Sequence, residues 1–207
     1  MLDRFRPLRI TGSAPFHYVL GPAGAAVLAA ERGIDVRELG YRRDKTLAIA
    51  HNQRLAHIIG VNGFYAALAA AAHRSHGQAQ LLEWWPERRC RGAWGDIVRP
   101  DGYGRWREHD REVDFFLEYD RGSETLDRVA AKLDPYAELL DVTEVRTPTL
   151  FWMPTHRREA ALRNLLQSVS VPVATAYSTL GRDPADAVWL AVGATDNARR
   201  RLASIDC

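Results

Sequence analysis

The spacing of apolar residues changes along the chain between strand-like and helix-like patterns. Short runs of apolar and β-branched residues predict strands over residues 4–9, 16–20, 80–85, 97–99, 113–119, 149–153, 171–177 and 187–192. Apolar positions three and four residues apart predict helices over residues 22–32, 46–73, 123–140, 157–168 and 196–204. Pro22 suits a first helical turn and Gly33 a helix end, whereas Pro135 predicts a break near Asp134.

The order of these elements predicts the fold class. From residue 80 onward strands come first and then alternate with helices, which indicates an α/β domain with a mixed sheet. Ahead of it, the turn residues 11–13 join two short strands into a hairpin, and Gly60 and Gly63 mark a kink or a close crossing in the long helix. The sequence therefore predicts a hairpin and helix over 1–45, a linking helix over 46–79 and an α/β domain over 80–207.

Composition bounds the class of protein. Apolar residues make up 46% of the chain, enough to fill a core, which excludes disorder over most of its length. The longest unbroken apolar run, residues 64–72, is too short for a membrane span, and the first twenty residues show no secretory signal. Cys90 and Cys207 form no disulfide framework. We expect a cytoplasmic protein with free thiols and no membrane partner.

Charge is distributed unevenly along the chain. Residues 1–79 carry ten basic and five acidic side chains, whereas residues 80–146 carry eleven basic and sixteen acidic ones. A basic front end suits the phosphate backbone of DNA, and an acidic middle suits a divalent cation or is a solvated face. Only two of the 28 basic residues are lysines, Lys45 and Lys132, so each of these lysines is a candidate for a specific role.

Three carboxylates follow two of the predicted strands. Asp101 ends the strand over 97–99, and Glu118 and Asp120 share one face at the end of the strand over 113–119. If the two strands pair as a hairpin, Asp101 comes near Glu118, and the three side chains form a Mg²⁺ site. The alternatives are that Asp101 is a turn residue, since Pro-Asp-Gly is a turn signal, and that Glu118 and Asp120 line an edge strand.

Other chemistries lack their motifs. The seven histidines show no zinc spacing, and neither a glycine-rich phosphate loop with a lysine nor a Gly-x-Ser-x-Gly element occurs in the sequence. The sequence therefore speaks against zinc, nucleotide binding and esterase chemistry.

The order of Pro100-Asp101, a strand with Glu118 and a helix resembles the PD-(D/E)xK nuclease superfamily, which has the restriction-endonuclease-like fold. Its motif has a lysine two residues after the second acid, where this sequence has Asp120. Some members carry the lysine on the following helix, the place of Lys132, and some have an upstream acid, for which Glu83 could stand. The resemblance implies Asp101 and Glu118 as ligands of Mg²⁺ and Lys132 as a support for the attacking water or the leaving phosphate.

A second resemblance covers most of the chain. The sequence is similar to the replication-relaxation family of actinobacterial plasmids and mobile elements, most specifically between Pro100 and Lys132. The segments that carry it are 16–25, 61–64, 98–102 and 116–124, with His57, Lys132, Leu133 and Tyr136. It implies a winged-helix DNA-binding part ahead of a nuclease-like domain, and a role in plasmid replication or DNA relaxation.

In such a protein the hairpin near the start would be the wing. The helices expected before a wing are missing from this sequence, so either the start is internal to a longer protein or the DNA reader has been lost. Three functions remain open. One is a DNA-binding module that kept a nuclease fold without its chemistry, which Asp120 favours. The others are an active Mg²⁺-dependent DNA endonuclease and a homodimeric interaction protein whose contact is the helix over 64–72.

Overall fold

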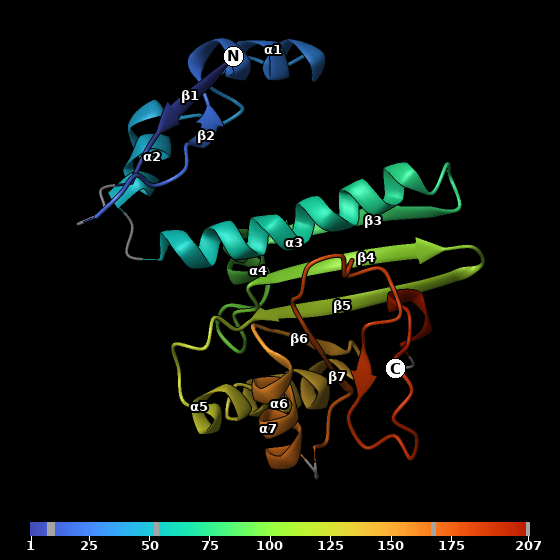
Figure 1. Cartoon of the computed structure of the whole chain (residues 1–207). Helices are drawn as coiled ribbons and strands as arrows, with labels where there is room; N and C mark the ends of the chain where they lie inside the picture. The colour runs from blue at the N-terminus through green and yellow to red at the C-terminus, as the bar shows by residue number, and fades with distance from the viewer. Residues whose placement is uncertain (8–10, 52–53, 167–168, 206–207) are drawn as a thin grey trace. The chain divides into compact units, whose positions relative to one another are not determined.

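The computed structural model describes residues 1–7, 11–51, 54–166 and 169–205. The chain divides into two compact units, residues 1–58 and 59–207. The first contains β1 (Leu2–Phe5), β2 (His17–Leu20), α1 (Pro22–Glu31), α2 (Arg43–Ala48) and a single 3₁₀ turn, Ile49–His51. β1 and β2 pair antiparallel, as the sequence predicted for a hairpin (Figure 1). β1 begins two residues before the strand predicted over 4–9, and residues 8 and 9 lie outside the described residues. Helix α1 begins with its proline in the first turn.

The second unit is built on a six-stranded mixed sheet, which confirms the predicted α/β class. Its strands lie in the order of the chain, and all neighbours are antiparallel except the pairs β5–β6 and β6–β7. They are β3 (Ala79–Pro86), β4 (Gly102–Glu108), β5 (Arg111–Tyr119), β6 (Thr149–Met153), β7 (Val173–Tyr177) and β8 (Leu190–Ala191). The three parallel strands therefore present their carboxyl ends at one edge of the sheet.

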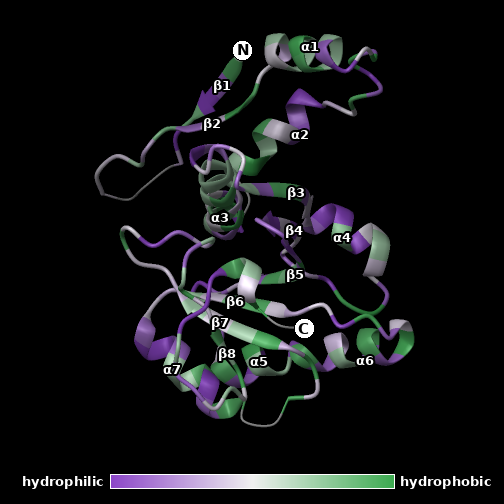
Figure 2. Cartoon of the chain, turned by 90° about the vertical axis from the view of Figure 1, so that its right-hand side faces the viewer, coloured by the Kyte–Doolittle hydropathy of each residue, from purple (hydrophilic) through white to green (hydrophobic). Residues whose placement is uncertain are grey.

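Two apolar layers cover the sheet. On one face, α3 (Leu55–Arg74) and the segment near the C-terminus pack against Phe115 and Leu117 of β5. On the other face, Phe116 of the same strand packs with four helices, as strand alternation requires. These are α4 (Glu87–Trp94), α5 (Leu126–Ala130), α6 (Leu133–Thr143) and α7 (His156–Leu165). Figure 2 shows apolar and polar residues alternating along these elements.

Helix α3 is long and apolar enough to cross a membrane by length and composition alone. Three of its large side chains, Val61, Phe64 and Leu68, are nevertheless buried in the core of the second unit. One face of the helix therefore packs on the sheet. Within the segment proposed as a dimer contact, Phe64 and Leu68 are buried and Tyr65 is 41% exposed.

The expectation of a strand over 97–99 was wrong. Those residues form the end of a loop, and the strand is β4, in the segment that the sequence suggested to be a turn. Its glycines are not turn residues. A Cβ at Gly104 would lie 2.4 Å from the Phe115 ring, and one at Gly102 would lie 2.9 Å from the Trp84 ring. Glycine is therefore required for close packing of the strand against aromatic rings.

Several helices also differ from the sequence prediction. The long helix begins at Leu55, because the residues after Thr46 first complete α2 and the 3₁₀ turn. The helix predicted over 123–140 is interrupted, as Pro135 predicted, but the break lies at residues 131–132, so that Pro135 falls in the first turn of α6, where proline is tolerated. Helix α4 was not predicted, and within the described part of 196–204 only a 3₁₀ turn, Leu202–Ser204, is helical.

Candidate functional site

The hairpin of β4 and β5 brings Asp101 beside the end of β5. Asp101 precedes β4 rather than ending a strand, but the start of β4 lies next to the end of its antiparallel partner. The backbone N–H of Asp101 donates to the carbonyl of Leu117 at 3.0 Å, and the N–H of Tyr119 donates to Asp101 Oδ2 at 2.9 Å. Asp101 and Glu118 are both buried, at 7% and 5% exposed.

Glu118 is held by two side chains from the junction of α5 and α6. Lys132 Nζ lies 2.9 Å from Glu118 Oε2, and the Tyr136 hydroxyl donates to Glu118 Oε1 at 2.6 Å. Lys132 occupies the N-cap position of α6, and Tyr136 follows one helical turn later, so both reach the same strand face. Lys132 also lies 3.4 Å from Glu124 Oε2 and keeps a third of its side chain exposed.

Burial and charge change the ionisation of this group. Burial, and next the negative charge of Asp101, raise the pKa of Glu118 to about 7, against the opposing effect of Lys132. For Lys132, burial alone would lower the pKa, but the adjacent Glu118 carboxylate outweighs it and raises the pKa above its ordinary value. The site thus combines two neighbouring carboxylates with one ammonium, and the ionisation of each group depends on the others.

Asp120 reaches the same face but belongs to another ion pair. Both of its oxygens accept from the guanidinium of Arg158, and Oδ1 also accepts from the N–H of Gly122 at 2.8 Å. Arg158 Nη2 further donates to the carbonyl of Glu124 at 2.6 Å. Asp120 therefore fixes the loop after β5 against the first turn of α7, and its charge is balanced by Arg158.

Arg158 and Tyr136 are the site residues that sequence reasoning missed. The signal for Arg158 is Thr155, whose hydroxyl accepts from the Arg158 N–H and caps α7 immediately after β6. Because β6 runs parallel to β5, the first turn of α7 must lie near the end of β5. The signal for Tyr136 is its spacing of four residues from Lys132.

Glu83, the upstream acid that the resemblance suggested, lies elsewhere on the sheet. It is opposite Arg105, which lies opposite Asp114 in β5, four residues before Glu118. Arg105 Nε donates to Asp114 Oδ1 at 2.7 Å, and Trp85 Nε1 donates to Glu83. The structure thus places Glu83 in a cross-strand row that is separate from Asp101 and Glu118.

The carboxylates fit a small cation site in part. Among the residues that the structure describes, no group of three histidine, cysteine or acidic side chains is arranged to hold a metal ion. Mg²⁺ is commonly bound by one or two carboxylates, with water and phosphate oxygens as its remaining ligands. Asp101 and Glu118 are two such carboxylates, both buried and close enough for the charge of Asp101 to raise the pKa of Glu118, whereas Asp120 is paired with Arg158.

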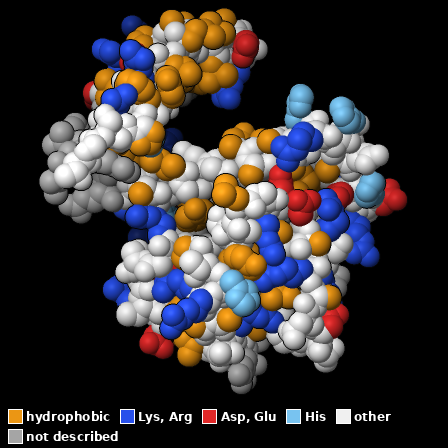
Figure 3. Space-filling view, viewed as in Figure 1, with side chains coloured by type: hydrophobic (Ala, Val, Ile, Leu, Met, Phe, Trp, Pro, Cys, Tyr) orange, Lys and Arg blue, Asp and Glu red, His pale blue; other side chains and the backbone are white. Residues whose placement is uncertain are grey.

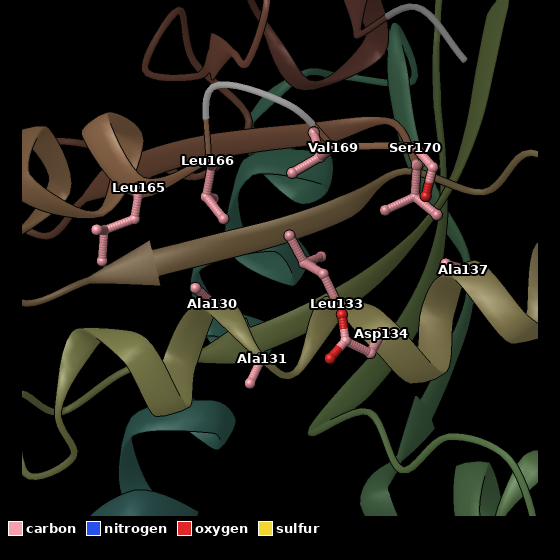
Figure 4. A pocket seen from close by; sticks show the side chains of 10 residues that line it. Ala130, Ala131, Leu133, Asp134, Ala137, Leu165, Leu166, Val169 and Ser170 are labelled. Carbon is pink, nitrogen blue, oxygen red and sulfur yellow. The ribbon is translucent and has the colours of Figure 1, made fainter.

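The surface cavity drawn in Figure 4 lies apart from these residues. It measures about 290 Å³ and is lined mainly by apolar side chains between the α5–α6 junction and the end of α7. Leu133, Leu166 and Val169 point toward it, and Asp134 is its one acidic residue. None of the carboxylates of the candidate site lines it.

A second candidate surface is the hairpin of the first unit. Its arginines Arg4 and Arg6 stack over the ring of Phe16, with guanidinium carbons 4.7 and 3.9 Å from the ring centroid. Arg6 also donates to the hydroxyl of Ser13 at 2.8 Å. Figure 3 shows basic side chains gathered on this unit. The stacking holds two cations outward, as a phosphate contact requires.

Comparison with known proteins identifies the family. A family model described as replication-relaxation matches residues 1–151, well over half of the chain. The chain belongs to the replication-relaxation family. The replication-relaxation match includes both strands of each hairpin and the residues Asp101, Glu118 and Lys132. Comparison with curated proteins and with solved structures gives no match. Membership in the replication-relaxation family suggests a role in plasmid replication or DNA relaxation.

Proposed function

We propose that this protein acts directly on DNA and that its second unit is a Mg²⁺-dependent DNA endonuclease. The observation that carries the proposal is the contact of 2.9 Å between Lys132 Nζ and the buried Glu118, beside Asp101. A lysine and two acids from three different segments meet at the end of one hairpin. This is the arrangement that the resemblance to the PD-(D/E)xK superfamily implied.

The order of elements supports the same proposal. A helix, three antiparallel strands, a helical pair and a strand parallel to the third occur in the order α3, β3–β5, α5–α6 and β6, with the short helix α4 inserted between β3 and β4. The helices cover opposite faces, and the acids lie at the hairpin end near the second helical layer. A restriction-endonuclease-like core has these parts in this order.

Each residue of the site would have a separate role in phosphodiester cleavage. Asp101 and Glu118 would hold the cation, which activates water and stabilises a pentavalent phosphorus centre when bound. Tyr136 fixes one oxygen of Glu118 through its hydroxyl, so that the carboxylate keeps one orientation. Lys132, one-third exposed, places an ammonium where it can contact a phosphate oxygen or the attacking water. Arg4 and Arg6 of the first unit would bind the DNA backbone.

A second function is favoured by a different observation. Asp120 stands at the position of the usual motif lysine and is neutralised by Arg158, and both oxygens of Glu118 already accept hydrogen bonds. These contacts satisfy the buried carboxylates without a metal ion. The same fold could then bind DNA in plasmid replication without cleaving it.

Incubation with supercoiled plasmid separates the two functions. We expect nicking in Mg²⁺ or Mn²⁺ and none in EDTA, and we expect Glu118→Ala to abolish it while DNA binding is kept. The matched control is Glu112→Ala, an exposed acid at the opposite end of β5. If the wild-type protein binds plasmid without metal-dependent nicking, the non-catalytic function is correct. Equal nicking by the Glu118→Ala variant would show that the site is misassigned.

A further inference from the structure

A group of cationic and aromatic side chains lies at the carboxyl edge of the parallel strands, outside the carboxylate site. Tyr177 ends β7, and the His156 ring meets the Tyr177 ring edge-on with centroids 5.4 Å apart. The guanidinium carbons of Arg182 and Arg199 lie 4.6 and 4.9 Å from the centroid of the same ring. On the face drawn in Figure 3, basic side chains and a histidine gather in the region of β6, β7 and α7.

The two arginines differ in how their charge is balanced. Arg199 forms an ion pair with the buried Glu159 at 2.7 Å and also donates to the carbonyl of Val188. For Arg182, atom Nη1 is buried and has no hydrogen-bond partner among the residues that the structure describes. The adjacent Asp183 is paired with Arg74. Because Nη1 is closed to solvent, an external anion would meet the other N–H groups of this guanidinium, and its charge would offset part of the cost of the unpaired nitrogen.

The position of this group relative to Glu118 follows from the sheet register. Asp120 donates its N–H to Trp152 in β6, and Met153 of β6 is the partner of Tyr177. Tyr177 therefore lies two strands away from the end of β5, at the same edge, a separation of roughly 10 Å at about 4.8 Å per strand. A single DNA strand can therefore reach both places within a few nucleotides.

We propose that Arg182, stacked on Tyr177 beside His156, binds a backbone phosphate of the same DNA strand whose scissile phosphate lies at Asp101 and Glu118. The inference rests on the proposed function for its ligand, a DNA strand, but not on cleavage. Tyr177 restrains the guanidinium by stacking, and the His156 ring packs against the same tyrosine. The guanidinium N–H groups other than Nη1 can then donate to a phosphate oxygen.

The test is duplex DNA binding in EDTA across a series of salt concentrations. Arg182→Gln should bind about five to ten times more weakly than wild type at 0.1 M salt, and the slope of log affinity against log salt should fall by about 0.9. The control is Arg111→Gln, an exposed arginine at the opposite end of the sheet that loses the same charge. Equal slopes and affinities for Arg182→Gln and Arg111→Gln would overturn the proposal.

Two further arms separate a failure of folding or of DNA binding from a failure of the subsite. If circular dichroism shows that Arg182→Gln is unfolded, Arg182→Met is used in its place, because the methionine keeps an apolar stem on Tyr177. If the wild-type protein retains no DNA, the proposed function fails and inorganic phosphate becomes the probe. Thermal stabilisation by phosphate that Arg182→Gln loses and Arg111→Gln keeps would then support a free-phosphate site. Equal or absent stabilisation in all three proteins would overturn the subsite.

Discussion

At the scale of single residues, the character of the site comes from burial rather than from the number of acids. Glu118 is surrounded by an ammonium, a phenol and the charge of Asp101. An isolated carboxylate at that depth would take up a proton at neutral pH, and the Lys132 ammonium offsets this tendency in part. The charged and neutral forms of Glu118 therefore have similar free energies, and a bound cation would favour the charged form.

This balance predicts how stability depends on pH. The folded pKa of Glu118, about 7, lies above its unfolded value of about 4.5, so ionisation costs more in the folded protein. Its contribution to stability is largest below pH 4.5 and declines as the pH rises to 7, by about 3 kcal/mol. Glu118→Gln removes this titration. The free energy of unfolding of Glu118→Gln minus that of wild type should therefore become more positive as the pH rises from 5 toward 8, with most of the change below pH 7.

Urea unfolding of both proteins at pH 5, 6, 7 and 8 measures that difference. Glu112→Gln, which alters a half-exposed acid on the same strand, is the control and should show almost no trend. A difference that stays constant from pH 5 to pH 8 for Glu118→Gln would mean that Glu118 titrates as it does in the unfolded chain.

At the scale of elements, the packing of α3 on the sheet depends on one glycine. A Cβ at Gly60 would lie 2.3 Å from the ring of Tyr119 in β5, whereas one at Gly63 would have no neighbour within 4 Å. The two glycines that the sequence singled out thus play different roles. Gly60 permits close contact between the helix and the strand that carries Glu118, and Gly63 has no such contact to make.

Substituting these glycines should change stability in opposite directions. Gly60→Ala should lower the free energy of unfolding by about 1–3 kcal/mol, because the added methyl group overlaps an aromatic ring. Gly63→Ala should raise it by about 0.5–1 kcal/mol, because alanine is the better helix former in an open position. Thermal and urea unfolding of both variants check the signs. Stabilisation by Gly60→Ala would contradict the observed contact between α3 and β5.

Sequence patterns predicted an element correctly where burial alone determines its residues. The run Thr149–Met153 is buried along its whole length, and its predicted bounds agree with β6. The patterns failed where a residue type has two uses, since the glycines of β4 indicate a turn in sequence but accommodate rings in the structure. At the site, Asp101, Glu118 and Lys132 could be selected from motif spacing. Arg158 could not, because its contact with Asp120 depends on the parallel pairing of β5 and β6.

At the scale of the whole molecule, charge separates into a basic front segment and an acidic middle segment. Residues 1–79 carry five more basic than acidic side chains, and residues 80–146 carry five more acidic ones. Acidic surface repels DNA, so the second unit alone would approach a duplex poorly unless cations gather near its site. The arginines of the first hairpin and Arg182 supply such cations within each unit.

The whole-molecule prediction concerns the source of DNA affinity. Replacing Arg4 and Arg6 together with alanine should weaken duplex binding and reduce the slope of log affinity against log salt by about 1.8, since two phosphate contacts are lost. The matched control is the double variant Arg32→Ala, Arg37→Ala, which removes the same charge from exposed positions of the same unit. Gel retardation at several salt concentrations distinguishes the two cases. If both double variants weaken binding equally, net charge attracts the DNA. If only the hairpin variant does so, the stacked arginines on Phe16 contact the phosphates directly.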